Sequence, residues 1–341
     1  MPAAEATEDP ISPQEAAELL NPLRFYRHVA IAVSGGGDSV ALMWLAAQWA
    51  GQTQQPPQLT ILTVDHGLRP GSAGEAQWVI ERARELGLAA VVLAWQGDKP
   101  ATGVQARARE ARYDLLVGWC VDHGAGALAT AHSLDDQAET FVMRLARGSG
   151  VDGLSGMRPS RHDRIAILRP LLGVSRARLR STLLAAGLSW LEDPSNRDPR
   201  FERVRWRNTL AFLEQEGLSP AMIALSARRL ERARQALEHA TSRLEESVVE
   251  HEDKQASFRL AAVEGEPEEL MLRLLRRLVM RYGAGGEPPE LAALERLSAW
   301  ITGGVSGGRT LAGCRITRRK DAVRVSREPP RRRPEISLPS R

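Results

Sequence analysis

Cysteine is almost absent from this chain of 341 residues, which contains only Cys120 and Cys314. The two lie far apart in the sequence and form no Cys-x-x-Cys pair, so neither a disulfide framework nor a cysteine zinc site is expected. This composition fits the reducing conditions of the cytosol, and we expect a cytoplasmic protein. A chain of this length can bury a hydrophobic core large enough to fold without such covalent or metal links.

Long apolar runs are missing as well. No run approaches the roughly 18 consecutive apolar residues of a membrane-spanning helix, so no membrane partner is expected. Residues 1–10 carry acidic side chains and no apolar core, which argues against a secretory signal peptide. The hydrophobic content of 43% and the charged content of 26% are those of an ordinary soluble protein. At roughly 100–200 residues per domain, the length predicts two or three domains.

A strong net charge is also missing, because the formal charge at pH 7 is +4. The charges are nevertheless unevenly distributed along the chain. Residues 197–207 contain five arginines and two acids, and residues 309–341 contain eleven basic and three acidic residues. Local basic clusters of this kind suit a polyanion such as nucleic acid. For the run Arg331–Arg333, a solvated and disordered tail is an equally good interpretation.

Segments typical of strands and helices alternate through the first part of the chain. The predicted strands cover 29–33, 59–64, 89–94, 127–131 and 165–168, and the predicted helices cover 40–50, 74–86, 104–121, 135–146 and 176–186. This alternation predicts an α/β fold with a parallel sheet that is covered on both faces. Ligands of such sheets bind beyond the carboxyl ends of the strands, and the three main motifs described below follow predicted strands.

The rest of the chain predicts a smaller, mostly helical domain with a short β part at its end. One stripe of a long helix is indicated by apolar residues that recur every seven positions: Ile223, Leu230, Leu237 and Leu244. Such a stripe more often packs inside one chain, although it also permits a homodimer. Two further helices are predicted at 267–282 and 289–302, and short strands between 309 and 327.

A glycine-rich loop joins the first predicted strand to the first predicted helix, with the sequence Ser34-Gly35-Gly36-Gly37-Asp38-Ser39. Glycines at such a junction let backbone N–H groups and the helix N-terminus approach an anion closely, and the serine hydroxyls add donors. The loop is not a Walker A loop, because no Gly-Lys-Ser/Thr follows it. It is not a Gly-x-Gly-x-x-Gly loop either, because Val40 occupies the third glycine's place.

The carboxylate of Asp38 refines what this loop would bind. A carboxylate repels phosphate unless Mg²⁺ lies between them, so the loop predicts ATP bound together with Mg²⁺, with Asp38 as a metal ligand. The alternative is a plain glycine-rich turn in which Asp38 or Ser39 caps the following helix.

A second motif, Asp65-His66, follows the second predicted strand. Asp65 lies at the carboxyl end of that strand and therefore faces the same crevice as the glycine loop. There it could bind a ribose hydroxyl, an adenine edge or a metal. The alternative is a loop in which both side chains make local turn bonds, and His66 is the weaker candidate of the two.

Three carboxylates crowd the first turn of the helix predicted from residue 135. Asp135, Asp136 and Glu139 lie close enough there for like charges to repel one another. The helix N-terminus relieves part of that repulsion, and a bound metal or ammonium group would relieve more. Ser133 and Asp136 also fit a capping box, so part of the pattern has a purely structural interpretation. His132 could accept a proton or simply bond the loop.

Arg109 and Arg112 lie three residues apart on one face of the helix predicted at 104–121. Their planar, permanently charged guanidinium groups could neutralise the phosphates of a bound nucleotide. The alternative is a surface salt bridge with Glu110 or Asp114.

The glycine loop resembles the Ser-Gly-Gly-x-Asp-Ser signature of the PP-loop ATP pyrophosphatases. Members have a Rossmann-like, adenine nucleotide alpha hydrolase-like nucleotide-binding domain and cleave ATP to AMP and pyrophosphate. The resemblance implies that Gly35, Gly36 and Gly37 cradle pyrophosphate and that Asp38 helps to hold Mg²⁺. Such enzymes typically adenylate a carbonyl-type oxygen, from which a nucleophile then displaces AMP.

The stretch His132-x-x-Asp135-Asp136-Gln137-x-Glu139-Thr140 resembles a motif of the tRNA(Ile)-lysidine synthetase family. Further similar stretches are Asp65–Arg69, Ala108–Tyr113, Arg144–Met157, Asp193–Asn196 and the pair Arg203 and Arg207. The resemblance covers roughly residues 25–210. Val204 stands where the family usually has Asn, which puts one local hydrogen bond in doubt.

This second resemblance implies a specific reaction. The family converts the wobble cytidine, position 34, of an isoleucine tRNA with a CAU anticodon to lysidine, using ATP and free L-lysine. Asp136 and Glu139 would then recognise the lysine ammonium, and a carboxylate or His132 would accept its proton. Arg203 and Arg207 would grip tRNA phosphates, or alternatively pair with Asp198 and Glu202.

The resemblance also assigns roles to the predicted domains. Residues 1–215 would form the catalytic domain, 216–330 a helical/α+β tRNA-binding domain, and 331–341 a basic tail. Two other functions stay open, a PP-loop tRNA 2-thiolase and a non-catalytic nucleic-acid-binding protein. Thiolation usually needs catalytic or cluster-binding cysteines, which this composition disfavours, and the intact loop and carboxylates disfavour a non-catalytic role.

Overall fold

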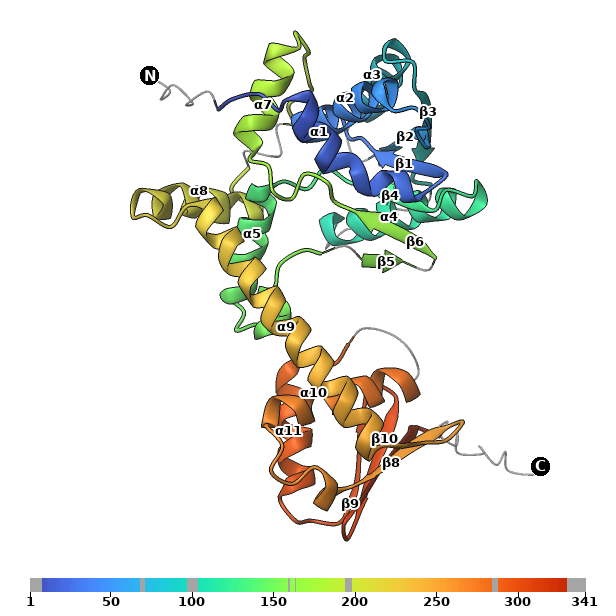
Figure 1. The fold of residues 1–341 in the computed structure, drawn as a ribbon, viewed down its shortest axis with the longest axis vertical. Helices are drawn as coiled ribbons and strands as arrows, with labels where there is room; N and C mark the ends of the chain where they lie inside the picture. Colours follow the sequence, from blue (N-terminus) through green and yellow to red (C-terminus); the bar gives the residue numbers. More distant parts are fainter. Residues whose placement is uncertain are drawn as a thin grey trace, which may run out of the picture. The chain divides into compact units, whose positions relative to one another are not determined.

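The computed structural model describes residues 8–67, 71–96, 104–158, 160–162, 164–193, 198–283 and 288–329 (Figure 1). The tail at 331–341 and most of the motif at 193–196 therefore lie outside the described residues. Contacts divide the chain into two compact units. Unit 1 comprises Met1–Gly148 and Gly153–Arg228, and unit 2 comprises Ser149–Asp152 and Arg229–Arg341. None of the described helices is long and apolar enough to cross a membrane.

Unit 1 is built on a six-stranded sheet in the order β3-β2-β1-β4-β6-β5. Its strands are β1 (His28–Ala32), β2 (Gln58–Asp65), β3 (Ala89–Ala94), β4 (Ala127–Ala129), β5 (Ser160–His162) and β6 (Ile165–Leu168). All neighbours pair in parallel except β5 and β6, which pair antiparallel. The predicted parallel sheet is thus confirmed, and the short edge strand β5 was not predicted.

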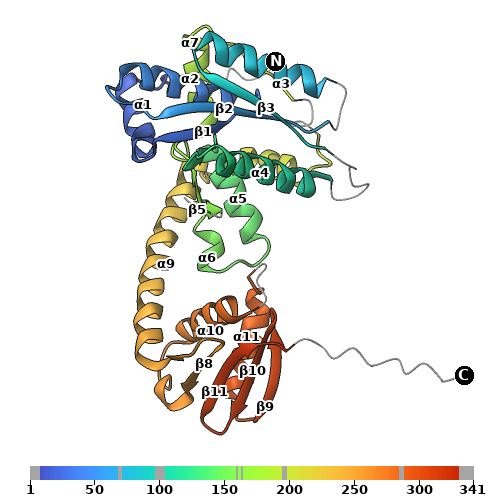
Figure 2. The ribbon, with the colours of Figure 1, turned by 90° about the vertical axis from the view of Figure 1, so that its right-hand side faces the viewer.

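Helices cover both faces of this sheet (Figures 1 and 2). They are α1 (Pro13–Leu20), α2 (Gly37–Gln52), α3 (Ser72–Glu85), α4 (Val104–Asp122) and α7 (Arg176–Ala185), whereas α5 (Leu134–Leu145) and α8 (Glu202–Gln215) pack against each other in a separate small core. Successive residues of β1 point to opposite faces, as the period of a strand requires. Val29 and Ile31 join a core with α1, α2, α3 and α7, whereas Ala30 joins a second core with α4. Burial on both faces explains why these strands are apolar throughout rather than alternating.

Unit 2 combines helices with an antiparallel sheet in the order β7-β8-β11-β10-β9. Its elements are α10 (Glu268–Tyr282), α11 (Leu291–Thr302), β7 (Glu250–His251), β8 (Gln255–Arg259), β9 (Gly307–Leu311), β10 (Cys314–Arg319) and β11 (Ala322–Arg327). The short helix α6 (Val151–Leu154) and the long helix α9 (Pro220–Val248) each belong to both units. The strands β7 and β8 were not predicted, so the β part of this unit is larger than the sequence indicated.

Three of the four residues in the seven-residue stripe of α9 pack against cores of the chain, whereas Leu230 is half-buried and joins none of them. Ile223 joins a small core with α5 and α8, and Leu244 joins the core of unit 2, against which Leu237 also packs. The division between the units falls at residues 228 and 229, inside α9. The functional roles assigned to the two domains stay predictions, as does the homodimer.

Candidate active site

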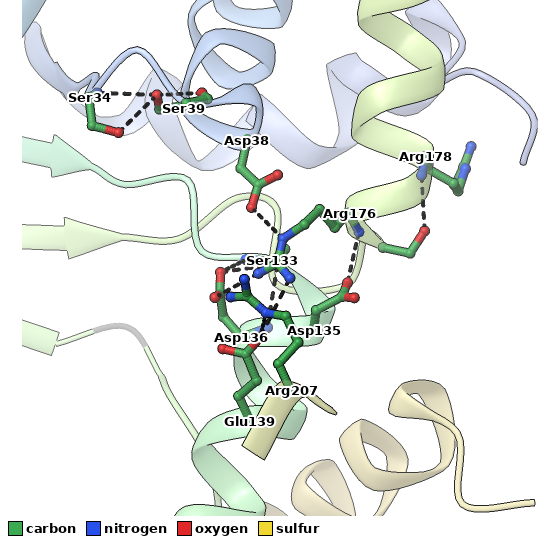
Figure 3. A network of polar contacts seen from close by, with 12 residues as sticks. Ser34, Asp38, Ser39, Ser133, Asp135, Asp136, Glu139, Arg176, Arg178 and Arg207 are labelled. Carbon is green, nitrogen blue, oxygen red and sulfur yellow. Dashed lines mark hydrogen bonds and ion pairs between the residues drawn. The ribbon is translucent and has the colours of Figure 1, made fainter. Parts of the chain in front are cut away.

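The glycine loop lies between β1 and α2, at the carboxyl end of the central strand. Helix α2 begins at Gly37, with Gly36 as its N-cap and no side-chain cap hydrogen bond, so neither Asp38 nor Ser39 caps it. The backbone N–H of Ser34 donates to Ser39 Oγ at 3.1 Å, and Ser39 Oγ donates to the Gly36 carbonyl at 2.8 Å. These bonds, drawn in Figure 3, close the loop on itself. The N-terminus of a 16-residue helix is thereby left without a side-chain cap, which suits anion binding.

Gly35 and Gly36 differ in how well the structure would accept a side chain, so alanine substitutions at the two positions form a matched test of the loop. Gly35 has φ +87°, and a Cβ there would lie 2.8 Å from Leu191 Cδ1. Gly36 has φ −70°, and the nearest atom to its Cβ would be Ser34 Oγ at 3.8 Å. We expect Gly35→Ala to destabilise the protein by about 1–3 kcal/mol, whereas Gly36→Ala folds normally but binds ATP more weakly. Thermal unfolding and ATP titration measure both effects, and unchanged ATP affinity in Gly36→Ala would contradict the anion cradle.

The three predicted carboxylates stand at the start of α5, where Ser133 is the N-cap of a complete capping box. Asp136 accepts hydrogen bonds from the Ser133 backbone N–H at 2.9 Å and from its hydroxyl at 3.0 Å. Glu139 lies one turn deeper and its side chain is only 1% exposed. Asp136 is therefore the N3 partner of the capping box, as the structural interpretation predicted, and it also contacts cations as described next.

Arg176, which sequence reasoning missed, lies at the centre of the acids (Figure 3). Its guanidinium is 3.2 Å from Asp38, 3.2 Å from Asp136 and 3.5 Å from Glu139. Its backbone N–H donates to the Asp135 carboxylate at 2.7 Å. One residue of α7 thus contacts four of the five carboxylates that the sequence singled out, all but Asp65. The crowding of acids predicted a cation at this place, but no local pattern showed that the cation would come from residue 176.

Arg203 and Arg207 of α8 also reach the α5 acids. Arg203 contacts Glu139 at 2.5 Å and Asp136 at 3.0 Å, and Arg207 contacts Glu139 at 2.9 Å. Both orientations follow from the packing of α8 on α5 through a small apolar core. The alternative partners are occupied by other arginines, because Arg200 pairs with Asp198 and Arg147 pairs with Glu202.

Burial and charge shift the pKa values of these groups in different directions. Burial raises the pKa of Asp38 to about 6, although the positive charge of Arg176 opposes the rise. Burial would also raise the pKa of Asp136, but Arg203, Arg176 and the Ser133 N–H outweigh it and hold this pKa below its usual value. For Arg176, burial lowers the pKa while Asp38, Asp136, Glu139 and Asp135 raise it, with a rise as the net result.

His132 precedes this cluster and is held by Thr130. The Thr130 hydroxyl lies 2.9 Å from His132 Nδ1 and 3.3 Å from the Leu168 carbonyl oxygen. Burial lowers the pKa of His132 to about 4; the charge of Asp136 opposes this shift, and the charges of Arg169, Arg109 and Arg203 add to it. The imidazole is therefore neutral at pH 7 and a weak base.

Arg109 and Arg112 are coupled electrostatically to the same cluster. The charge of Arg109 lowers the pKa of His132, and the charge of Arg203 lowers the pKa of Arg112. Burial and the neighbouring charges of Arg109 and Arg203 lower the pKa of Arg112. The Arg109 guanidinium lies 5.5 Å from the ring centre of Tyr113, whereas Glu110 pairs with Arg107 at 2.7 Å. Within the described part of the chain neither arginine forms an ion pair, which leaves both available to an anion.

Asp65 lies at the end of β2, beside the strand that carries the glycine loop. Its Oδ1 accepts from the Gly67 N–H at 3.0 Å and from the Ser72 hydroxyl at 2.6 Å. These are the local turn bonds of the alternative interpretation. A role in ribose or adenine binding stays a prediction.

The stretch from Arg144 to Met157 has a structural explanation. Arg144 donates to the Gly153 carbonyl at 2.8 Å and to the Gly156 carbonyl at 3.1 Å. Gln137 bonds the backbone of Met157 in both directions, at 2.9 and 2.5 Å. Because Gly156 has φ +76° and a Cβ there would lie 2.8 Å from Gln137 Oε1, only glycine fits. The segment after α5 is thus fixed by α5 itself.

Comparisons with known proteins agree with this site. Residues 9–213 match the PP-loop domain family. The chain is 44% identical over 347 residues to the tRNA(Ile)-lysidine synthase of Bradyrhizobium sp. (strain BTAi1 / ATCC BAA-1182), covering 95% of this chain and 96% of the relative. The chain belongs to the tRNA(Ile)-lysidine synthase family. The synthase of Rhodopseudomonas palustris (strain ATCC BAA-98 / CGA009) is 41% identical, with coverage of 94% and 96%. Both resemblances drawn from the motifs are confirmed.

A solved structure supports the fold of this lysidine synthase family member. The U34-tRNA thiolase NcsA from Methanococcus maripaludis, with its [4Fe-4S] cluster, has a TM-score of 0.55 and 18% identity, covering 64% of this chain and 78% of the thiolase. At this identity the likeness shows the fold alone. In the present chain Cys120 and Cys314 are both buried, in different cores, and burial raises the pKa of each thiol to about 11. Neither cysteine therefore suits cluster binding or thiolation.

Proposed function

We propose that the protein is a carbon–nitrogen ligase that joins free L-lysine to C2 of the wobble cytidine of tRNA(Ile) with a CAU anticodon. ATP adenylates the C2 oxygen and releases pyrophosphate, and the ε-amine of lysine then displaces AMP to give lysidine. The observation that carries this proposal is the glycine loop facing the α5 acids in a chain so similar to tRNA(Ile)-lysidine synthases. A tRNA substrate also fits the expected cytoplasmic location.

The residues divide between the two halves of the reaction. The loop of Ser34–Ser39 would hold the pyrophosphate part of ATP, with Arg109 and Arg112 neutralising phosphate charge. Asp136 and Glu139 would recognise the lysine ammonium from the other side. Both already bind arginines, so the ammonium would have to share or replace a guanidinium. His132 is a weak base, so a positioning role fits it better than proton transfer.

Magnesium fits Asp38 as part of a metal–nucleotide complex. Asp38 Oδ2 contacts Arg176, whereas Oδ1 forms no hydrogen bond within the described residues, and the side chain is 22% exposed. No group of three or more His, Cys, Asp or Glu in the described ranges could hold a metal by itself. This matches the usual way Mg²⁺ binds, through one or two carboxylates and substrate phosphates. When bound there, it would neutralise phosphate charge as ATP is cleaved.

The outer face of the sheet in unit 2 supports a tRNA-binding role for this unit. Strand alternation buries Ile316, Val323 and Val325 on one face and exposes arginines on the other. Those exposed arginines are Arg259, Arg315, Arg319 and Arg324. None of them forms an ion pair with another described residue, and by its register Glu250 of the edge strand shares this face. A face so rich in unpaired guanidinium groups suits phosphodiester backbone.

This surface leads to a quantitative expectation. Replacing Arg315, Arg319 and Arg324 together by Gln should raise the KM for tRNA about tenfold. It should also reduce the salt dependence of binding, because each lost phosphate contact lowers the slope of log K against log salt concentration by about one. The maximal rate should not change. The matched control replaces the exposed arginines Arg24, Arg27 and Arg84 of unit 1, and equal effects in both triple variants would contradict a specific surface.

The central test is mass spectrometry of in vitro transcribed tRNA(Ile) after incubation with ATP and L-lysine. We expect the mass gain of lysine minus water on the wobble cytidine, with multiple-turnover pyrophosphate release that requires lysine and tRNA together. Pyrophosphate release beyond one equivalent per enzyme without lysine, or modification with a sulfur donor only, would contradict the proposal. Asp136→Ala should remove the modification if the site is assigned correctly.

A further inference from the structure

Arg176 is shared among three carboxylates that belong to two separate elements. Its Nε contacts Asp38 at 3.2 Å, Nη2 contacts Asp136 at 3.2 Å and Nη1 contacts Glu139 at 3.5 Å. A guanidinium normally binds one carboxylate with two parallel bonds near 2.8 Å. Here the group divides its donors instead, and its contacts with Asp136 and Glu139 are longer than those that Arg203 makes to the same acids.

The charges around Arg176 show what depends on it. Arg203 and Arg207 also neutralise Asp136 and Glu139. Asp38, by contrast, has Arg176 as its single cationic partner in the part of the chain that the structure describes. Arg176 is therefore the group that joins the nucleotide half of the site to the α5 acids, as Figure 3 shows.

The backbone of Arg176 is held independently of its side chain. Ser175 caps α7 by accepting from the Arg178 N–H at 3.2 Å, and the Arg176 N–H donates to Asp135 at 2.7 Å. The guanidinium can consequently leave the acids by side-chain rotation alone, without unwinding α7. An alkylammonium offers three donors from one atom and can bind the same oxygens.

From this geometry, and resting on the proposed function, we infer that Arg176 is the resident cation of the site. In the substrate-free protein its guanidinium occupies the place of the substrate ammonium and fixes Asp38, Asp136 and Glu139 as a set. Lysine binds by displacing the guanidinium from the α5 acids. Arg176 thus acts as a positioning residue: it holds the acids in the arrangement that binds lysine, and it competes with lysine for the same acids.

Two opposite effects of removing this guanidinium distinguish the inference from a merely structural role. In Arg176→Gln the acids lose their internal competitor, so L-lysine should bind about fivefold more tightly to the protein without ATP or tRNA. The same variant should lose about tenfold or more in kcat, because the acids are no longer held in register. Arg176→Lys keeps a cation and should lie between the variant and the natural protein in both quantities.

The control is Arg178→Gln, two residues along the same helix. Arg178 pairs with Glu15 at 2.6 Å, outside the acid cluster, so its loss should change stability but neither lysine affinity nor kcat. Calorimetric titration with L-lysine measures the affinity, and quenched assays of tRNA modification measure kcat and KM. If Arg176→Gln fails to fold, Arg176→Met, which keeps the length of the alkyl chain, carries the same expectation.

The outcomes separate this inference from the proposed function. If the natural protein forms lysidine but Arg176→Gln binds lysine no more tightly than it does, the resident-cation inference is wrong and the function stands. If the natural protein forms no lysidine but Arg176→Gln still gains affinity for lysine, the function fails and the inference stands. A kcat loss with unchanged or weaker lysine affinity would make Arg176 a direct substrate contact and overturn the inference.

Discussion

Asp38→Asn is expected to abolish ATP-dependent lysidine formation while making the ligand-free protein more stable at about pH 8. The carboxylate is the proposed Mg²⁺ ligand beside the phosphates, and its loss should lower activity at least about 100-fold. Asn keeps an oxygen that can accept from Arg176 Nε, so the local geometry should survive. Modification assays and thermal or urea unfolding measure the two effects on the same preparation.

The stability gain follows from the raised pKa of Asp38, which burial moves from 3.8 to about 6. Because the folded protein resists ionisation of this group, the stability it contributes is present below about pH 4 and is lost as pH rises to about 6. The shift of about two pKa units corresponds to at most about 3 kcal/mol, and residual exposure reduces it to about 1–2 kcal/mol. The neutral Asn variant avoids this loss.

The pH dependence is therefore the decisive measurement for Asp38. The difference in unfolding free energy between Asp38→Asn and the natural protein should be largest above pH 6 and vanish near pH 4. Asp122→Asn, an exposed change at the end of α4, serves as the control and should alter neither stability nor activity. If the difference in unfolding free energy stays constant from pH 4 to above pH 6, the pKa of Asp38 is not raised in the ligand-free protein.

The parallel sheet and the glycine loop could be predicted because their signals are local. Apolar runs such as 29–33 ending in glycines define a buried strand followed by an anion-binding turn. The clustering of Asp135, Asp136 and Glu139 was also visible, since all three lie on one helical turn. The sequence thus predicted the groups that lie close together along the chain, namely the loop and the carboxylates, but not the residues that these groups contact.

The partners of these groups could not be predicted, because they come from distant parts of the chain. Arg176 is 138 residues from Asp38, and Arg207 is 68 residues from Glu139. Nothing in the local pattern around Arg176 distinguishes it from Arg178, which pairs with Glu15 instead. Only the packing of α7 and α8 decides which arginine meets the acids. The strands β7 and β8 were missed because β7 spans only two residues and β8 carries polar residues on its outer face.

Glu139→Gln is expected to cause the largest loss of stability of any single change in this site. Glu139 is 1% exposed and accepts from Arg203 at 2.5 Å, from Arg207 at 2.9 Å and from Arg176 at 3.5 Å. Removing its charge leaves three guanidinium groups facing an amide, whose N–H₂ end cannot accept from them. Breaking a buried ion pair from one side typically costs about 3–5 kcal/mol.

The matched control for this change is Glu202→Gln, because Glu202 pairs with Arg147 at 2.7 Å with side chains 43% and 61% exposed. An exposed pair of that kind contributes about 0–1 kcal/mol. Urea unfolding of both variants measures the contrast. Adding Arg207→Gln to Glu139→Gln should cost less than Arg207→Gln alone, since the guanidinium no longer has an anion to neutralise. If Glu139→Gln lowers the free energy of unfolding by less than about 1 kcal/mol, water rather than Glu139 satisfies these arginines. The positions of the α8 arginines would then follow from the apolar packing of α8 on α5 alone.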